Sequence, residues 1–218
     1  MIRSTARILL IGAVAVLALV WWACGNGQDS FDADSVLEMD RGVRLLEDGH
    51  FEQAHGVFDS VVRKEPRNAE AYARRGFAQL ALGGVTGGLA DINRALEINP
   101  DYALAHNYKG VVFGMNGIRD QAILEFTRAV ELAPGLTEAY VNRGKIYLEM
   151  SDGESALADL DTALDLEPEN AELLLIRAQT HLILGNTGRA EADLERVLSL
   201  PVDEATLAAA RQVLSRIR

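Results

Sequence analysis

Histidine, cysteine and serine most often carry catalysis or bind metal ions, and this sequence offers few of them in useful arrangements. His50 and His55 are five positions apart, so they miss the i, i+4 spacing that places two zinc ligands on one helix face. The single cysteine, Cys24, can complete neither an intrachain disulfide nor a Cys-based zinc site. No serine lies in a Gly-x-Ser-x-Gly elbow. We therefore expect no catalytic residue, no metal site and no cofactor, and we do not expect an enzyme.

The stretch from Gly83 to Gly88, Gly-Gly-Val-Thr-Gly-Gly, comes nearest to a phosphate-binding loop. Such a loop follows a strand and ends in Gly-Lys-Ser or Gly-Lys-Thr, because the lysine and the hydroxyl contact the phosphates and magnesium. Neither feature is present here. We interpret the stretch as a loose turn between two helices and expect no small-molecule substrate.

The composition excludes a further class of function. The chain has 218 residues, with 21 Lys and Arg against 32 Asp and Glu, a formal net charge of −11 and 49% apolar residues. This much apolar material predicts a folded protein. Binding to DNA or RNA depends on basic side chains that displace counterions from phosphates, so we expect no nucleic-acid partner.

The first 23 residues differ from the rest of the chain. Arg3 and Arg7 precede an uninterrupted apolar run from Ile8 to Trp22. At about 1.5 Å per helical residue this run reaches roughly 22 Å, which is short of the ~30 Å hydrocarbon core that a permanent span must cross. We therefore predict that residues 1–23 are a signal peptide or membrane anchor, with the two cations on the cytoplasmic side and the remaining chain outside it.

The residues after this run, Ala23-Cys24-Gly25-Asn26-Gly27, resemble a bacterial lipoprotein signal. The resemblance implies that Cys24 is lipidated and becomes the new N-terminus, ahead of a flexible tether over residues 24–34. Trp21 and Trp22 stand where that family usually has an aliphatic and a small residue. Because indoles suit a membrane interface, a retained signal helix is an alternative, and a released chain is a third. The expected location is the bacterial cell envelope, facing the periplasm or the exterior.

The remaining sequence repeats every 34 residues, in one column of prolines, three of small residues and one of large apolar residues. The columns are Pro66, Pro100, Pro134 and Pro168; Gly42, Gly76, Gly110, Gly144 and Ala178; Gly49, Gly83, Gly117, Ser151 and Gly185; Ala54, Gly88, Ala122, Ala156 and Ala190; and Phe58, Ile92, Phe126, Leu160 and Leu194. Within each unit the apolar spacing predicts two amphipathic helices that are separated by a turn and ended by the proline. Gly110 and Ala122 should leave room for a neighbouring backbone.

This pattern resembles the tetratricopeptide repeat, a helix-turn-helix unit of 34 residues. The resemblance covers residues 35–204 in five units, which are 35–68, 69–102, 103–136, 137–170 and 171–204. A capping helix over residues 205–218 is expected to cover the last unit. The resemblance implies an all-α solenoid whose concave face binds other proteins or peptides, and it puts His106 and His181 at aromatic packing positions.

Charged residues form two further columns. The basic column is Arg41, Arg75, Lys109, Arg143 and Arg177 in the first helices, and the acidic column is Asp91, Glu125, Asp159 and Asp193 in the second helices. One interpretation is a basic ladder for an acidic ligand. We favour structural ion pairs between the columns, because the charges have counterparts and their apolar stems can pack on the helices.

The concave face should be lined by the fifth, ninth and twelfth residues of each unit. This stripe is Met39, Val43, Leu46, Ala73, Phe77, Leu80, Asn107, Val111, Gly114, Val141, Lys145, Leu148, Leu175, Gln179 and Leu182, with Arg74, Tyr108, Met115 and Asn142 beside it. From these we predict a peptide-binding groove of Arg74, Phe77, Asn107, Tyr108, Val111, Asn142 and Lys145. Tyr108 and Met115 could equally pack between helices, since spacing alone does not separate core from groove.

Two features of the groove bear on the type of partner. Some tetratricopeptide proteins clamp a C-terminal carboxylate with Lys and Asn on successive first helices, and no unit here carries that pair. Glu70, Glu138 and Glu172 could form an acidic rim, although the helix dipole already accounts for acids in a first turn.

We therefore expect a non-enzymatic scaffold or adaptor that docks a partner segment in an apolar groove. The main alternative is a structural or assembly subunit of an envelope complex, of the pilus or secretion type, that uses its convex face or its ends. An enzyme is the least favoured class, because no acid, base and nucleophile can be assembled into a site.

Overall fold

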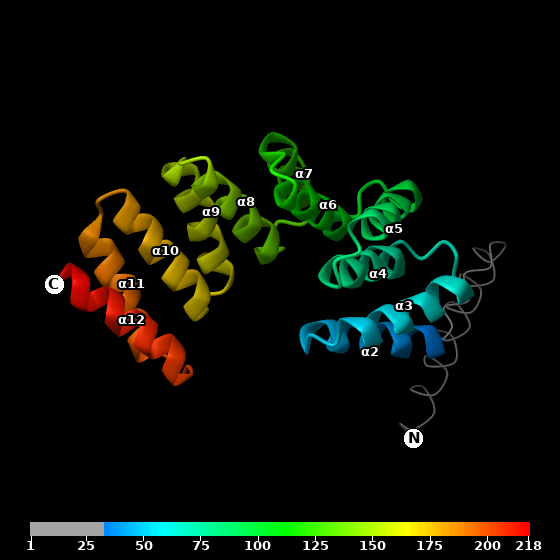
Figure 1. The fold of residues 1–218 in the computed structure, drawn as a ribbon, viewed down its shortest axis with the longest axis horizontal. Coiled ribbons are helices and arrows are strands. Elements are labelled where there is room, and N and C mark those ends of the chain that lie inside the picture. Colours follow the sequence, from blue (N-terminus) through cyan, green and yellow to red (C-terminus); the bar gives the residue numbers. More distant parts are fainter. Residues whose placement is uncertain (1–32) are drawn as a thin grey trace, which may run out of the picture. The chain divides into compact units, whose positions relative to one another are not determined.

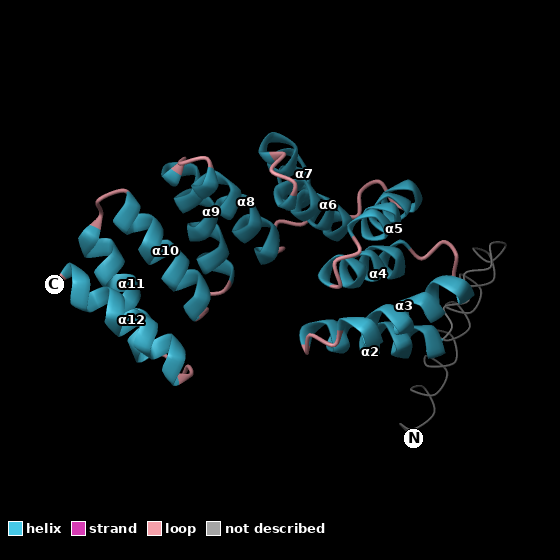
Figure 2. Cartoon of the chain, viewed as in Figure 1, coloured by secondary structure: helices cyan, strands magenta, loops and turns pink. Residues whose placement is uncertain are grey.

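The computed structural model describes residues 33–218, so the predicted signal segment and Cys24 lie outside the described residues. Residues Glu38–Arg218 form one compact unit. Every regular element in the described part is an α-helix (Figure 1, Figure 2). In residues 33–218, none of the helices combines the length and the apolar character that a membrane crossing requires.

The helices come in pairs joined by short turns. Their bounds are α2 Ala33–Glu47, α3 Phe51–Lys64, α4 Ala69–Ala81, α5 Val85–Ile98, α6 Ala103–Met115, α7 Arg119–Leu132, α8 Thr137–Glu149, α9 Gly153–Leu166, α10 Ala171–Ile183, α11 Thr187–Ser199 and α12 Glu204–Ile217. Consecutive helices from α3 to α12 pack against each other, and the first helices α4, α6 and α8 also contact one another in sequence. This arrangement confirms the expected all-α solenoid of helix pairs.

The turn inside each pair requires a left-handed backbone at one position. Gly49, Gly83, Gly117 and Gly185 have φ between 71° and 85°, and Ser151 has φ of 64°. Glycine adopts this region without steric cost because it has no Cβ, which explains the column. The predicted loose turn over Gly83–Gly88 is wrong beyond Gly84, because α5 begins at Val85 and includes the last four residues of that stretch.

The prolines lie just beyond the second helices. Glu65, Asn99, Ala133 and Glu167 cap the C-termini of α3, α5, α7 and α9, and each precedes a proline. A residue before proline is pushed out of the helical region by the proline ring. The chain then enters the next first helix, and the side chains of Asn68 and Asn170 cap α4 and α10 by accepting hydrogen bonds from backbone N–H groups.

The column of large apolar residues forms the centre of each helix pair, and its members are at most 1% exposed. Small residues in the first helices make this burial possible. A Cβ on Gly110 would lie 2.6 Å from the Phe126 ring, whereas a Cβ on Gly76 would lie 2.7 Å from the backbone oxygen of Gly88. The close neighbour of Gly110 is thus an aromatic ring, and the expected close approach of a backbone occurs at Gly76 instead.

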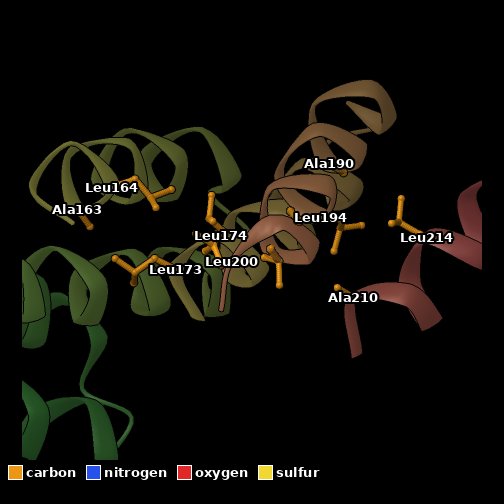
Figure 3. Close-up of a cluster of buried hydrophobic side chains, with 11 residues drawn as sticks. Ala163, Leu164, Leu173, Leu174, Ala190, Leu194, Leu200, Ala210 and Leu214 are labelled. Carbon is orange, nitrogen blue, oxygen red and sulfur yellow. The ribbon is translucent and has the colours of Figure 1, made fainter. Parts of the chain in front are cut away.

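The last helix packs on the end of the array. Ala210 and Leu214 of α12 are buried in one cluster with Leu194 of α11 and with residues of α9 and α10 (Figure 3). The side chain of Asp203 accepts a hydrogen bond from the backbone N–H of Thr206 and so caps α12. α12 therefore covers apolar surface of the fifth helix pair, as expected of a capping helix.

Candidate functional site

The basic column of the first helices forms structural ion pairs. Arg75 donates two hydrogen bonds to Asp91, both of 2.7 Å, and a third of 2.8 Å to Asp59 in the preceding helix pair. The equivalent pairs are Lys109–Glu125, Arg143–Asp159 and Arg177–Asp193. The interpretation as structural ion pairs is confirmed for these four cations, which join the two helices of a pair rather than form a ladder for an acidic ligand.

A pocket of about 400 Å³ lies across four successive first helices. It is lined by Phe77 of α4; by Asn107, Tyr108 and Val111 of α6; by Thr137, Glu138, Val141, Asn142 and Lys145 of α8; and by Glu167, Asn170, Glu172 and Leu173 from the end of α9 to α10. Six of the seven residues predicted for the groove are therefore in one lining. Their role in binding stays a prediction.

The seventh, Arg74, lines a neighbouring pocket of about 610 Å³. Tyr108, Thr137, Glu138 and Glu167 line both pockets, so the two adjoin. The Nε of Arg74 donates a hydrogen bond of 2.7 Å to Glu70. Arg74 thus forms an ion pair with Glu70 within α4. Because its Nε already donates to Glu70, fewer of its N–H groups are left to donate to a ligand in the pocket.

Aromatic side chains form one wall of the pockets. The rings of Phe77 and Tyr108 are stacked with centroids 4.6 Å apart, and Phe51 meets Phe77 edge to face at 6.5 Å. Burial raises the pKa of the Tyr108 phenol, and it raises the pKa of Tyr102 to about 12. Both phenols stay protonated at neutral pH, and the stacked pair gives the groove a rigid apolar surface.

Two asparagine side chains in the lining of the first pocket are hydrogen-bonded to each other. Asn142 donates a hydrogen bond of 3.1 Å to the Oδ1 of Asn107, and Asn107 donates one of 3.5 Å to Glu138. Asn107 is only 1% exposed. A buried amide is destabilising unless it is hydrogen-bonded, so this chain of contacts fixes the amide orientations between α6 and α8.

Several predicted positions lie elsewhere. Ala73 and Leu80 are buried in the core with Ile92 and do not line either pocket. Met115 is 62% exposed at the end of α6 and also lies outside both pockets. The physical reason is that a stripe chosen by helical spacing takes no account of the crossing angles between helices, which turn some of its members inward.

Sequence reasoning did not include Thr137, Glu167, Asn170 or Leu173 in the lining. These residues belong to helix ends and connections, whereas the stripe considered one face of each first helix. The position of Glu167 before Pro168 is no signal for the lining, because Glu65 also precedes a proline and lines neither pocket. Of the acidic rim, Glu138 and Glu172 line the pocket, and Glu70 pairs with Arg74.

The two histidines of the repeats have different surroundings. The Nδ1 of His106 lies 2.6 Å from Glu125, and its Nε2 lies 2.9 Å from the carbonyl oxygen of Pro100. The hydrogen bond to Glu125 raises the pKa of His106, against an opposing effect of burial. His181 is buried, and burial lowers its pKa. Residues 33–218 contain no group of three or more side chains placed to hold a metal ion.

Comparison with known proteins identifies the repeat. A model of the tetratricopeptide repeat family matches residues 39–103, 74–137 and 141–205. The SGT1 homolog of Oryza sativa subsp. japonica is 36% identical over 63 residues, which cover 29% of this chain and 17% of that protein. The chain spans less than a quarter of the length of the curated relatives it matches.

Solved structures share the fold. The thermophilic repeat protein TTC0263 from Thermus thermophilus has a TM-score of 0.71 at 22% identity, covering 83% of this chain and 98% of that one. The pilF protein of Pseudomonas aeruginosa has a TM-score of 0.69 at 17% identity, covering 83% of this chain and 84% of that one. Since the family match extends over more than half of the sequence and the helix pairs recur every 34 residues, the chain belongs to the tetratricopeptide repeat family.

Proposed function

We propose that this chain is a non-enzymatic scaffold or adaptor that binds a segment of another protein in the groove formed by α4, α6, α8 and α10. The observation that carries the proposal is the pair of adjoining pockets, about 400 and 610 Å³, across successive first helices. Stacked repeats typically bind partners on an extended surface of this kind.

The chemistry of the lining suits a polypeptide. Phe77, Val111 and Val141 offer apolar surface for side chains, while Asn107 and Asn142 bring amide groups that match the donors and acceptors of a peptide backbone. The stacked rings contact each other, and the two amides are hydrogen-bonded to each other. Binding therefore orders few receptor side chains, which lowers its entropic cost.

Photo-crosslinking in whole cells tests the groove. Crosslinking residues at Phe77, Val111 and Lys145 should each capture the same segment of the same partner, identified by mass spectrometry. The matched control is Leu124, which is 60% exposed on the second helix α7. Capture at Leu124 but at none of the three groove positions would contradict the proposal.

We further propose that the chain works at a bacterial envelope membrane, anchored by a lipid on Cys24 or by a retained signal helix. The support is the sequence, in which Arg3 and Arg7 precede an apolar run that ends before Cys24. Metabolic labelling with an alkyne fatty acid should label the native chain and leave Cys24→Ser unlabelled. Membrane retention of an unlabelled native chain would favour the signal helix, and recovery in the soluble fraction would exclude both anchors.

A second candidate is a structural or assembly subunit of an envelope complex, and one observation favours it. Large apolar side chains are 44% to 70% exposed where the first helices end and the second begin, namely Leu82, Met115, Ile118, Met150 and Ile183. Such side chains are typical of an interface when they gather. Crosslinkers at Met150 and Ile183 separate the candidates, since capture there without capture in the groove would favour the assembly subunit.

A further inference from the structure

Two exposed glutamates line both pockets of the groove and form no ion pair within residues 33–218. Glu138 is in the first turn of α8, and Glu167 is the C-cap of α9. Within residues 33–218 their carboxylates accept hydrogen bonds from amides, from Asn107 to Glu138 at 3.5 Å and from Asn170 to Glu167 at 2.8 Å. Neither forms an ion pair with a described Lys, Arg or His, although both lie in the wall of the proposed binding groove.

The cations of the same lining are engaged with other acids. Arg74 pairs with Glu70 at 2.7 Å, and the Nζ of Lys145 lies 3.9 Å from Glu172. The remaining acid of the second pocket, Asp101, pairs with Arg128 at 2.7 Å. The acids on the shared wall that form no ion pair are therefore Glu138 and Glu167, although the charge of Arg74 also acts on Glu138.

These two carboxylates also affect each other. Desolvation by the surrounding protein raises the pKa of Glu138, the charge of Arg74 opposes this rise, and the charge of Glu167 adds to it. The helix dipole favours an acid at the N-terminus of α8 but disfavours one at the C-terminus of α9. The helix dipoles therefore favour Glu138 and disfavour Glu167, whose structural contact is the hydrogen bond from Asn170, the N-cap of α10.

The shape of the lining restricts what can neutralise this charge. Phe77, Val111 and Val141 make an apolar wall beside the acids. A long aliphatic stem with a cationic end fits such a surface, because the stem packs on apolar atoms while the head reaches the polar ones. An acidic side chain would be repelled, and an apolar one would desolvate the carboxylates without pairing them.

We propose that the groove takes an extended polypeptide segment with a lysine or arginine whose head group lies between Glu138 and Glu167 and whose stem lies along the Phe77 wall. This inference rests on the proposed function, because it specifies the partner of the same groove. It differs from the family's clamp for C-terminal carboxylates in that the protein supplies the anions and the partner supplies the cation.

Peptide selection tests the inference with the full chain reconstituted in lipid nanodiscs. A library of random 12-residue peptides displayed on their mRNA is selected against the native chain, and the affinities of the enriched peptides are measured by fluorescence anisotropy. We expect Lys or Arg to be enriched at one position of the selected peptides. Replacing that residue by norleucine should weaken binding by up to about fivefold, the size expected of an ion pair with exposed carboxylates.

Variants of the protein test whether Glu138 and Glu167 pair with the basic residue of the peptide. The double variant Glu138→Gln/Glu167→Gln should bind the basic peptide more weakly than the native chain does, by the same factor. Its affinity for the norleucine peptide should be no lower than its affinity for the basic peptide. The matched control is Glu65→Gln/Glu154→Gln: Glu65 accepts the equivalent hydrogen bond from Asn68 at 2.7 Å, Glu154 is in the first turn of α9, and neither lines the two pockets. The control should bind both peptides as the native chain does.

The outcomes separate the inference from the proposed function. Selected peptides that compete with one another and lose affinity in Phe77→Ala, but show no basic residue or no response to the double variant, would overturn the inference and leave the groove as a binding site. Failure to select any peptide that responds to Phe77→Ala would count against both. Charge reversal adds a positive test, since Glu138→Lys/Glu167→Lys should prefer peptides with Glu at the selected position.

Discussion

At the scale of single residues, the turn column shows how backbone geometry selects a residue type. Ser151 is the one member with a Cβ among the five described turn residues, and it adopts φ of 64°. A left-handed backbone costs a residue with a Cβ roughly 1–2 kcal/mol, which exceeds the extra entropy that glycine loses on folding. We predict that Ser151→Gly raises the free energy of unfolding by roughly 0.5–1 kcal/mol, measured by urea denaturation followed by circular dichroism.

The reverse change is the control. Gly117 has φ of 71°, and a Cβ built on it would meet no atom within 4 Å, so Gly117→Ser tests backbone strain without a clash. It should lower the free energy of unfolding by a similar amount. Equal stability of both variants and the native chain would show that these turns tolerate a Cβ.

A second residue-scale prediction concerns pH. The raised pKa of His106, due first to its hydrogen bond with Glu125, means that the protonated imidazole stabilises the fold. This contribution is complete below the unfolded-state value of about 6.5 and is lost as pH rises through the raised folded-state value. The carbonyl of Pro100 also favours the protonated form, and Lys109 opposes it.

We therefore predict that the native chain loses stability relative to His106→Gln as the pH rises above about 6.5. The measurement is the denaturation midpoint of both proteins between pH 5 and 9. The other histidines are present in both proteins, so their contributions cancel in the difference. Parallel curves over the whole range would contradict the assigned role of His106.

At the scale of helices, two glycines in the same column should respond in opposite ways. A Cβ on Gly110 would lie 2.6 Å from the buried Phe126 ring, whereas the nearest atom to a Cβ on Gly144 would be the oxygen of Ala156 at 3.5 Å, an ordinary contact. Overpacking costs about 1–3 kcal/mol, and alanine gains up to about 1 kcal/mol over glycine in a helix.

We accordingly predict that Gly110→Ala lowers the free energy of unfolding by about 1–3 kcal/mol and that Gly144→Ala raises it by up to about 1 kcal/mol. Thermal and urea denaturation of the two single variants provide the measurement. The occurrence of Ala178 at the equivalent place in the fifth unit agrees with the second prediction. Destabilisation of equal size in both variants would mean that the two helix crossings are equally tight.

The helices are also the level at which sequence was most informative. Apolar spacing, glycine turns and prolines act within one helix pair, so the two helices of each unit and the turn between them could be predicted from the sequence. The lining of the groove depends on how successive first helices cross. That angle decides that Leu80 turns into the core, that Phe77 stacks on Tyr108 and that Glu167 reaches the pockets, and no local pattern in the sequence specifies it.

At the scale of the whole array, stability should depend on nearest neighbours. Each helix pair contacts mainly the pair before and the pair after it. A change at one end should therefore weaken the adjacent pair most, and its effect on stability should decay along the chain. The C-terminal end offers the cleanest case, because α12 alone covers the outer surface of α11 with the buried residues Ala210 and Leu214.

We predict that truncation after Val202 loosens α10 and α11 selectively. Removal of α12 exposes Leu194 and Val197, which are at most 1% exposed in the intact chain, and the uncovered apolar surface no longer stabilises the last pair. Hydrogen–deuterium exchange should accelerate by at least about tenfold across residues 171–199, where the local opening free energy falls, and should change little across α4 and α5.

Leu214→Ser should give a smaller change in the same segment, because it removes one contact and keeps the helix. An increase spread evenly over all helix pairs would show that the array unfolds as a single cooperative unit, and the nearest-neighbour description would then fail for this chain.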